Sequence, residues 1–374
     1  MIDTRIGGED IIWEESAGET IKPTSTIRSR TVYAGERIDA MCALVVACLL
    51  AAEGCAPPHD GNVSNHFDGK RFHNVKPVDH SFGRFLKWTS SRTPGRWRDW
   101  TDAEPGPAPP ERVGRGDLRV TFVNHATVLV QMDGLNILTD PIWSDRCSPF
   151  AWVGPRRRRP PGIRFEDLPP IDVVLISHDH YDHLDVPTLE RLDSEHQPRF
   201  LAGLGNAAFL NRNGIDRADQ LDWWQTATLS ETVRLHCVPA QHWSGRGVGD
   251  RNQTLWCGFV IEGPAGVVYF AGDTGFGPHF AQIRDRFGPP RLALLPIGAF
   301  MPRWFMSPFH ISPAEAVRVH GILGAGTSVA IHFGTFPLAD DDEDEPVALL
   351  TRALEEADES RPNFWVLDFG EGRD

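Results

Sequence analysis

The chain has 374 residues, 41% hydrophobic and 24% charged, which is ordinary globular composition and enough for one large α/β domain with extensions. The formal net charge of −14 argues against a nucleic-acid-binding protein, which usually presents a basic surface. The six cysteines include no CxxC pair, so neither a zinc ribbon nor a dense disulfide framework is indicated.

A short apolar run stands near the N-terminus. Residues 1–40 are polar and aperiodic, and we expect them to be disordered or a misassigned extension upstream of a true start at Met41. The apolar run that follows is too short to span a bilayer but is typical of a signal-peptide core. Small residues then precede Cys55, so residues 41–55 predict a lipoprotein signal with Cys55 lipidated, although Glu53 departs from that pattern. A short buried helix is the alternative. The signal would place the protein in the bacterial cell envelope as a membrane-anchored lipoprotein; without it we expect a membrane-associated cytoplasmic protein.

Residues 56–117 are expected to form an N-terminal extension and linker, since Pro, Gly and charged residues are frequent over 89–117. A compact domain then begins at residue 118 and runs to about residue 370. Alternating apolar residues predict strands at 118–123, 127–131, 135–139, 171–176, from 200, and at 232–238, 254–261, 266–270, 291–296, 327–331 and 364–367. Helices are predicted from about residue 186, before Gly214, and at 278–287, 312–323 and 344–357. Hairpins early in the domain and strand–helix alternation later predict an α/β fold of two mixed sheets flanked by helices.

Histidines and aspartates are concentrated directly after one of these strands. Ser177-His178-Asp-His180-Tyr-Asp182-His183-Leu-Asp185 follows a buried apolar strand and precedes a helix. His178 and His180 are two residues apart, so in extended backbone they point to the same side. Asp182 and His183 follow as the chain turns, and can face a second point nearby. Imidazole and carboxylate are ligands that zinc favours, so a metal site explains this segment better than a surface polar loop does.

Further ligands are available at the ends of later strands. His242, Asp273 and His332 each follow a short apolar strand and precede a turn. Each is weak evidence alone, because a histidine after a strand is more often structural. Together with the first segment they form a coherent set for a dinuclear site.

The order His-x-His-x-Asp-His, followed by His, Asp and His, resembles the metallo-β-lactamase superfamily. Longer segments resemble the N-acylphosphatidylethanolamine-hydrolysing phospholipase D family, over about residues 62–370. The segments that carry this resemblance are Asn124-His-Ala-Thr127, Leu138-Thr-Asp-Pro-Ile142, Val153-Gly-Pro-Arg156, Leu168-Pro-Pro-Ile-Asp-Val-Val-Leu-Ile-Ser-His178, Leu221-Asp-Trp-Trp224, Pro239-Ala-Gln-His-Trp243, Ala271-Gly-Asp-Thr-Gly275, Pro296-Ile-Gly-Ala299, Pro302-Arg-Trp-Phe-Met306 and Ile331-His-Phe-Gly-Thr-Phe336. The resemblance implies the metallo-β-lactamase αββα sandwich over residues 118–370 as the catalytic domain.

The resemblance also implies two zinc ions and assigns their ligands. His178, His180 and His242 would hold one ion, Asp182, His183 and His332 the other, and Asp273 would bridge the two. Asp179 and Asp185 lie in the motif without being ligands, and Asp179 replaces an Asn of the better-known lipid enzymes. We expect Asp185 and Asp140 to orient ligands. Asn124 and His125 are either cleft residues or a polar strand end.

Residues 299–310 predict an apolar, aromatic loop beside the metals. An acyl chain suits such a wall, although a loop packed on the core is an equal alternative. The resemblance implies that His310 contacts the phosphate and is catalytic together with Asp273; we expect Arg303, Trp304 and Phe305 to bind substrate with it. The basic run at residues 156–159 either meets anionic lipid or is a solvated loop.

The function implied is a zinc phosphodiesterase of phospholipase D type that releases N-acylethanolamine and phosphatidic acid from N-acylphosphatidylethanolamine. A hydrolase of lactones or of a soluble phosphodiester is the alternative, because the metal site does not fix the bond cleaved. A lipid-anchored binding protein with a vestigial site is a third, which the complete ligand set argues against. Expected partners are a phospholipid substrate and a membrane surface, no nucleic acid, and a second copy of the chain in a homodimer.

Overall fold

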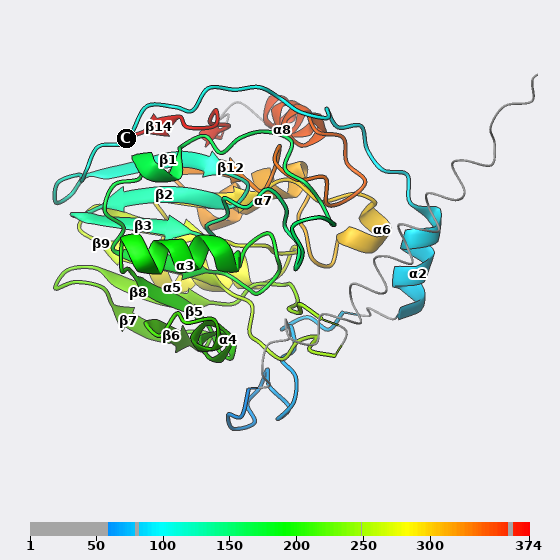
Figure 1. Ribbon diagram of the computed structural model, residues 1–374, viewed down its shortest axis with the longest axis horizontal. Helices are drawn as coiled ribbons and strands as arrows, with labels where there is room; N and C mark the ends of the chain where they lie inside the picture. Colours follow the sequence, from blue (N-terminus) through cyan, green and yellow to red (C-terminus); the bar gives the residue numbers. More distant parts are fainter. Residues whose placement is uncertain (1–58, 79–81, 248, 358–361) are drawn as a thin grey trace, which may run out of the picture. The chain divides into compact units, whose positions relative to one another are not determined.

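Two seven-stranded β-sheets form the centre of the fold (Figure 1). The computed structural model describes residues 59–78, 82–247, 249–357 and 362–374, so residues 1–40 and the predicted signal at 41–55 lie outside it. The strand order is β14-β1-β2-β3-β4-β5-β6 in the first sheet and β13-β12-β11-β10-β9-β8-β7 in the second. Each sheet starts as antiparallel hairpins and continues with parallel strands, so the two sheets repeat one pattern.

The strands have these bounds. The first sheet contains β1 (Leu118–Asn124), β2 (Thr127–Met132), β3 (Leu135–Thr139), β4 (Val173–Ile176), β5 (Arg199–Gly203), β6 (Ala218–Leu221) and β14 (Gly372–Arg373). The second contains β7 (Thr226–Thr228), β8 (Arg234–Val238), β9 (Gly258–Gly263), β10 (Gly266–Phe270), β11 (Leu292–Pro296), β12 (Thr327–Ile331) and β13 (Phe364–Trp365).

Helices cover the outer face of each sheet, which gives the predicted αββα arrangement (Figure 1). Over the first sheet lie α3 (Val186–Glu195) and α4 (Asn206–Arg212). Over the second lie α5 (His279–Phe287), α7 (Pro313–Leu323) and α8 (Glu345–Glu356). The other helices within the described ranges are α2 (Phe82–Ser91), α6 (Arg303–Met306) and the 3-10 helix η2 (Phe165–Asp167). Among the described residues no helix is both long and apolar enough to cross a bilayer.

The alternation of side chains along the strands explains the layers. On β2, Val128 and Val130 pack between the sheets, whereas Leu129 packs under the helices of the first sheet. On β4, Val173 and Leu175 face the second sheet and the intervening residues face α3. Both faces of these strands are buried, so they carry apolar residues almost continuously. The hairpin between β2 and β3 turns at Asp133 and Gly134, which both have positive φ (51° and 83°).

The predicted elements of the domain are present, with shifted ends and several omissions. The largest shift is at β9, predicted at 254–261, because residues 254–257 are buried without pairing as a strand. Prediction missed β6, β7, β14 and the short α6. It also missed α2, which lies within the predicted extension; beyond α2, residues 92–117 contain no helix or strand, as expected.

Candidate metal centre

The predicted ligands all follow carboxyl ends of strands on one edge of the two sheets. His178 lies two residues beyond β4, Asp273 three beyond β10, His332 directly after β12 and His242 four beyond β8. These strands run in the same direction within their sheets, so their ends share an edge. The positive φ of His332 (61°) turns the chain out of β12 at once and aims the imidazole at the centre.

One group consists of His178, His180 and His242, here called the three-His group. The Nδ1 atom of His180 lies 2.8 Å from Nε2 of His178 and 3.3 Å from Nε2 of His242. Burial lowers the pKa of His180 to about 3 and holds those of His178 and His242 well below the usual range. Three neutral imidazoles that converge on one point present the lone pairs that a metal cation requires.

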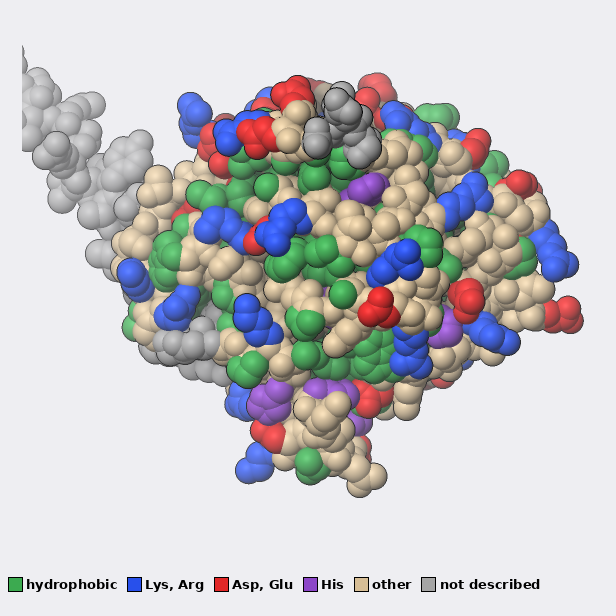
Figure 2. Space-filling view, turned by 180° about the vertical axis from the view of Figure 1, so that it is seen from behind, with side chains coloured by type: hydrophobic (Ala, Val, Ile, Leu, Met, Phe, Trp, Pro, Cys, Tyr) green, Lys and Arg blue, Asp and Glu red, His purple; other side chains and the backbone are tan. Residues whose placement is uncertain are grey.

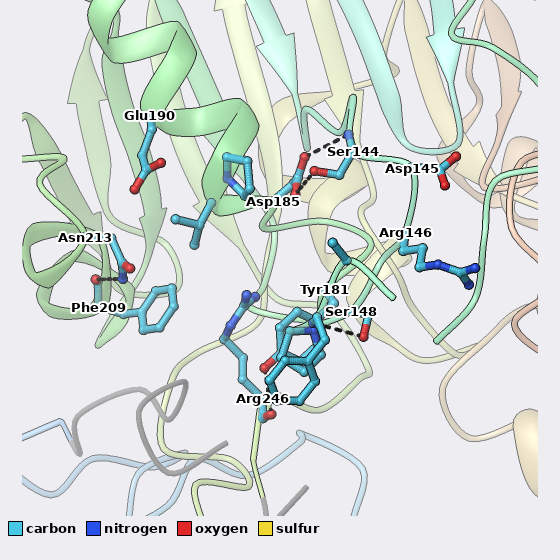
Figure 3. Close-up of a pocket in the computed structure, with 15 residues that line it drawn as sticks. Ser144, Asp145, Arg146, Ser148, Tyr181, Asp185, Glu190, Phe209, Asn213 and Arg246 are labelled. Atoms are coloured by element: carbon cyan, nitrogen blue, oxygen red, sulfur yellow. Dashed lines mark hydrogen bonds between the residues drawn. The ribbon is translucent and has the colours of Figure 1, made fainter. Parts of the chain in front are cut away.

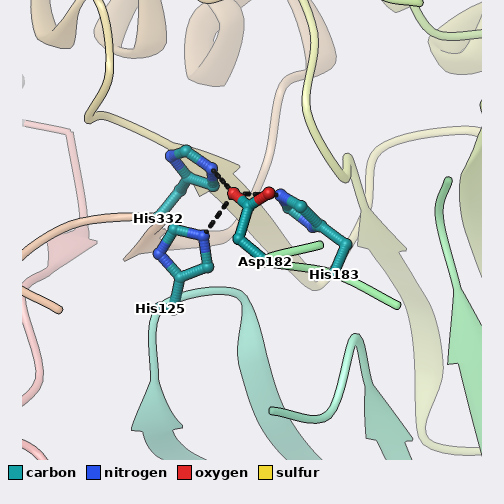
Figure 4. Close-up of side chains that lie close together, drawn as sticks. All are labelled: His125, Asp182, His183 and His332. Atoms are coloured by element: carbon teal, nitrogen blue, oxygen red, sulfur yellow. Dashed lines mark hydrogen bonds and ion pairs between the residues drawn. The ribbon is translucent and has the colours of Figure 1, made fainter. Parts of the chain in front are cut away.

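The second group consists of Asp182, His183 and His332, here called the Asp/His group (Figure 4). Oδ2 of Asp182 lies 3.2 Å from Nε2 of His183 and 3.4 Å from Nε2 of His332. Burial opposes protonation of His332, but Asp273 and Asp182 outweigh it and raise its pKa to about 9. This group therefore differs from the first in carrying a carboxylate and a strong preference for positive charge.

Asp273 lies between the two groups. Its Oδ2 atom is 3.2 Å from Nε2 of both His183 and His332, and 3.8 Å from Nε2 of His242. Burial opposes ionisation, but His332 and His183 hold the pKa of Asp273 well below its usual range. An ionised carboxylate that reaches both groups has the position of a bridging ligand.

The donors fit divalent metal ions of the zinc type. Nε2 of His183 and Nε2 of His332 are buried at ion-pair distance from the carboxylates but form no well-directed hydrogen bond, and the buried Oδ1 of Asp273 has no hydrogen-bond partner within the described part of the chain. Buried polar atoms without partners are costly, and a cation bound among nitrogen and oxygen donors would satisfy them. The structure thus brings together all seven predicted ligands.

Polar neighbours hold the far sides of the ligand rings. Asp140 accepts a hydrogen bond from Nδ1 of His183 at 2.6 Å and from the Ser177 hydroxyl at 2.6 Å, and that hydroxyl lies 2.9 Å from Nδ1 of His178. Asp140 therefore orients ligands, as predicted. Asp185 does not, because its carboxylate contacts Ser144 and Thr188 at the start of α3.

Asp179 connects the metal motif to residues 245 and 254 through hydrogen bonds. Its carboxylate accepts hydrogen bonds from the Gly245 N–H (2.7 Å) and the Thr254 hydroxyl (2.8 Å). Burial raises the pKa of Asp179 to about 6. The carboxylate ties the motif to the segment that carries His242.

His125 belongs to the site, although the sequence left its role open. Its Nε2 atom lies 2.9 Å from Oδ2 of Asp182, and Figure 4 shows its ring beside those of His183 and His332. Its carbonyl accepts the N–H of His332 at 2.7 Å. A positive φ (46°) directly after β1 places it there, and the sequence signal that could have found it is a histidine at the end of a buried strand.

His310 faces the centre from the segment that contains α6. Its Nδ1 atom is buried and lies 3.8 Å from Oδ2 of Asp273. Burial lowers its pKa to about 4, which leaves a neutral ring. The preceding carbonyl, that of Phe309, accepts from Nδ1 of His242 at 3.0 Å. The segment thus holds one ligand and presents a further imidazole beside the bridging carboxylate.

The other predicted substrate residues lie in three environments. Arg303 pairs with Glu315 at 2.7 Å and donates to the His310 carbonyl at 2.9 Å, so it positions His310. Phe305 is buried in a stack with Trp88 (4.8 Å between ring centroids), whereas Trp304 is 39% exposed. Their contact with substrate stays a prediction.

The four arginines of the basic run 156–159 make contacts within the fold. Arg156 pairs with Asp145, Arg157 is buried against backbone carbonyls, Arg158 donates to the Asp99 carbonyl and Arg159 lies over the Phe369 ring. The expectation that this run meets anionic lipid also stays a prediction. Figure 2 shows acidic and basic side chains dispersed over the face that it presents, without a large field of one sign.

A pocket of about 550 Å³ borders the back of the metal motif (Figure 3). Tyr181, Asp185 and Arg246 line it with residues of the 144–151 loop, α3 and α4, and none of the seven predicted ligands does. Arg246 stacks over Tyr181 (3.9 Å to the ring centroid) and donates to the carbonyls of Asp179 and Leu184. Arg246 therefore holds the turn of the metal motif in place from the side of the pocket.

Comparison with known proteins assigns the chain to a family. Residues 135–333 match the model of the beta-lactamase superfamily domain. Over 261 residues the chain is 45% identical to an uncharacterized protein of Mycobacterium tuberculosis, covering 68% of this chain and 69% of that protein. The chain belongs to the metallo-β-lactamase superfamily, and it is a metal-dependent hydrolase of that superfamily.

Relatives with named activities are also found. The chain is 41% identical to N-acyl-phosphatidylethanolamine-hydrolyzing phospholipase D 1 of Caenorhabditis elegans, over 59% of this chain and 65% of the nematode protein. It is 36% identical to the mitochondrial N-acyl-phosphatidylethanolamine-hydrolyzing phospholipase D of Saccharomyces cerevisiae, over 59% of this chain and 48% of the yeast protein. Among solved structures, isothiocyanate hydrolase from Delia radicum gut bacteria shares the fold (TM-score 0.54, 20% identity, 68% of this chain and 98% of that one).

Proposed function

We propose that this protein is a dinuclear zinc phosphodiesterase of phospholipase D type, which hydrolyses N-acylphosphatidylethanolamine to N-acylethanolamine and phosphatidic acid. The observation that carries the proposal is the complete ligand set around Asp273, in a chain whose relatives include the nematode and yeast enzymes of that name.

Each ion has its own set of residues in this proposal. The three-His group would hold one zinc, the Asp/His group the other, and Asp273 would bridge them. Two such ions, when bound, lower the pKa of water and polarise a phosphoryl oxygen, which is the chemistry that phosphodiester hydrolysis needs.

His310 supplies the protein's own acid–base group. Its imidazole faces Asp273 across 3.8 Å and belongs to neither group. From that position Nδ1 can hydrogen-bond a phosphoryl oxygen or return a proton to the leaving alkoxide of the N-acylethanolamine. Arg303, through its bond to the His310 carbonyl, fixes the ring for this role.

Exposed residues of α2 and α6, near the segment that carries His310, support a lipid substrate. Leu86 of α2 is 50% exposed and Trp304 is 39% exposed. Arg84 and Lys87 lie over the Trp304 ring, at 5.8 and 4.8 Å from its centroid. Exposed apolar side chains interleaved with cations are typical of a surface that contacts phospholipid head groups.

The test uses vesicles. Full-length protein is incubated with N-acylphosphatidylethanolamine and, separately, with unmodified phosphatidylethanolamine in isotopically labelled water, and the products are identified by mass. We expect N-acylethanolamine and phosphatidic acid, with the label in the phosphatidic acid because water attacks phosphorus. Turnover of a lactone or a soluble phosphodiester, with no turnover of either phospholipid, would overturn the proposal in favour of the alternative substrate class.

A further inference from the structure

Residues 59–78 are anchored to the catalytic domain although they lie outside the family-model match at 135–333. Phe67 and Phe72 are buried in the main core. His66 stacks on Trp223 (4.5 Å between centroids) and pairs with Asp222 at 2.7 Å. In Figure 2 this segment projects from the lower edge of the molecule, with histidines gathered at its base. The segment is thus fixed in place just before it reaches the metal centre.

Asn74 then contacts a predicted metal ligand with both ends of its amide. Its Nδ2 donates to the carbonyl of His242 at 2.7 Å, and its Oδ1 accepts from the N–H of His242 at 3.0 Å. The indole N–H of the fully buried Trp256 donates to the same Oδ1 at 2.9 Å, which fixes the orientation of the amide.

The residues on both sides of His242 are held by the same segment. The side chain of Gln241 donates to the Lys76 carbonyl at 2.8 Å. On the other side, the N–H of Phe72 donates to the carbonyl of Asn252, whose own N–H donates to Ser244. The segment therefore bonds the His242 backbone directly, the Gln241 side chain directly, and Ser244 through Asn252.

The backbone of His242 is not held by regular secondary structure. It lies four residues beyond β8, in a stretch without helix or strand, so no ladder bond fixes its backbone. Its ring has one bond outside the centre, from Nδ1 to the Phe309 carbonyl. The groups that orient ligands are typically worth 10- to 100-fold in metal affinity.

We propose that Asn74 is a positioning residue for the three-His group, so that the N-terminal segment completes this half of the metal centre. The inference rests on the proposed two-ion centre and is independent of the lipid substrate. It assigns to residues outside the family domain a role in holding one specific ion.

The test measures metal affinity directly, with the full-length protein and zinc in competition with a chromophoric chelator. Asn74→Ala removes both bonds to His242, and we expect the affinity for one of the two ions to fall about 10- to 100-fold while the other changes little. Asn74→Asp keeps the acceptor, loses the donor and should fall between Asn74→Ala and wild type. His73→Ala is the matched control, because that neighbouring side chain is 54% exposed and, among the residues that the structure describes, pairs with Asp68 alone.

A second readout separates positioning from folding. Cobalt is substituted for zinc, and its visible spectrum reports the ligand geometry of each site. The spectrum of one site should change in Asn74→Ala, while thermal unfolding of the metal-free variant stays close to that of the His73→Ala control. Equal weakening of both ions, or unchanged affinity and spectrum, would overturn the inference. Because no substrate is used, an unexpected substrate for the enzyme would leave this result intact, whereas wild-type protein that binds no zinc would overturn the metal centre itself.

Discussion

The two groups of the metal centre are built in different ways. The Asp/His group is supported from inside the domain, by Asp140 behind His183 and by His125 beside Asp182. The three-His group is supported by the Ser177 hydroxyl, the Phe309 carbonyl and Asn74. The difference teaches that the two sheets and the loops at their ends supply one group's support by themselves, whereas the other group also needs the N-terminal segment at residues 59–78.

The groups also differ in charge. The three-His group is neutral, because burial holds the imidazole pKa values low. The Asp/His group contains an ionised carboxylate, and burial and the carboxylates together set the pKa of His332 at about 9. Carboxylates attract a dication more strongly than imidazoles do, so we expect the Asp/His group and Asp273 to bind first, and the three-His group to be more sensitive to loss of support.

The largest effect should follow from removing the residue that the groups share. Asp273→Ala leaves each group without its bridging carboxylate, so we expect activity to be abolished and metal content to fall below two ions per chain. Elemental analysis of the purified variant checks this, with Asp285→Ala as a control on an exposed carboxylate. Full metal loading in Asp273→Ala would contradict the bridging assignment.

The sequence could predict the ligands because each follows a buried strand within a few residues or belongs to the histidine- and aspartate-rich segment after β4. An unbroken run of apolar residues predicts a buried strand, as Val173–Ile176 does before His178. The two-residue spacing of His178 and His180 then predicts one common target. Long elements with a strong apolar pattern, and the residues at their ends, could therefore be predicted from the sequence.

Asp140 apart, the residues that support the ligands could not be predicted, for a physical reason. A carboxylate at Asp185 can face a metal ligand or the start of a helix, and only the packing of α3 decides. Asn74 is one amide in a polar segment, and its value comes from contacts across a sequence distance of 168 residues. The strands β6 (ADQL) and β7 (TAT) were missed because they are short and polar, and they form by pairing with neighbours.

The next effect concerns the chemistry between the groups. His310→Asn should retain two ions and a normal fold but lose about 10²- to 10⁴-fold in rate on the phosphodiester, which is the usual contribution of an acid–base group. The loss should be smaller on an ester whose leaving group needs no proton. His320→Asn is the control, because the His320 imidazole on α7 hydrogen-bonds Ser328 on β12, between the helix and the second sheet.

Two other results would reassign His310. Loss of one zinc from His310→Asn would make it a metal ligand, and full activity on N-acylphosphatidylethanolamine would make it structural. Steady-state rates and metal content, measured on the same preparation, distinguish these cases.

A smaller effect would separate the two groups. His125→Gln removes the imidazole that donates to Asp182, so the ion of the Asp/His group should bind about 10- to 100-fold more weakly. The ion of the three-His group should be little affected, which is the reverse of the result expected for Asn74→Ala. Chelator competition on both variants gives the answer, and the same ion weakened in both would remove the distinction between the groups.

The smallest effect on function concerns Asp341, a residue beyond the C-terminal end of the family match that supports the segment carrying His310. We expect it to appear in the free energy of unfolding alone. Asp341 is buried, and its carboxylate accepts from the N–H groups of Ala299 and Met301 at the start of the segment that carries His310. Burial raises the pKa of Asp341 to about 6, above the value near 3.9 of an unfolded chain.

The folded protein therefore keeps this proton to a higher pH than the unfolded chain does. The contribution of the protonated group to the free energy of unfolding is fully present below about pH 4 and is lost as the pH rises through 6. Asp341→Asn stays neutral at every pH, so between about pH 4 and pH 7 its free energy of unfolding should fall by about 2–3 kcal/mol less than that of the wild type. Denaturant unfolding of the metal-free proteins at several pH values measures the difference, with Asp285→Asn as the exposed control. Identical pH dependence in wild type and Asp341→Asn would mean that the carboxylate is ionised in the fold, and that it holds the His310 segment as an anion rather than as a neutral acid.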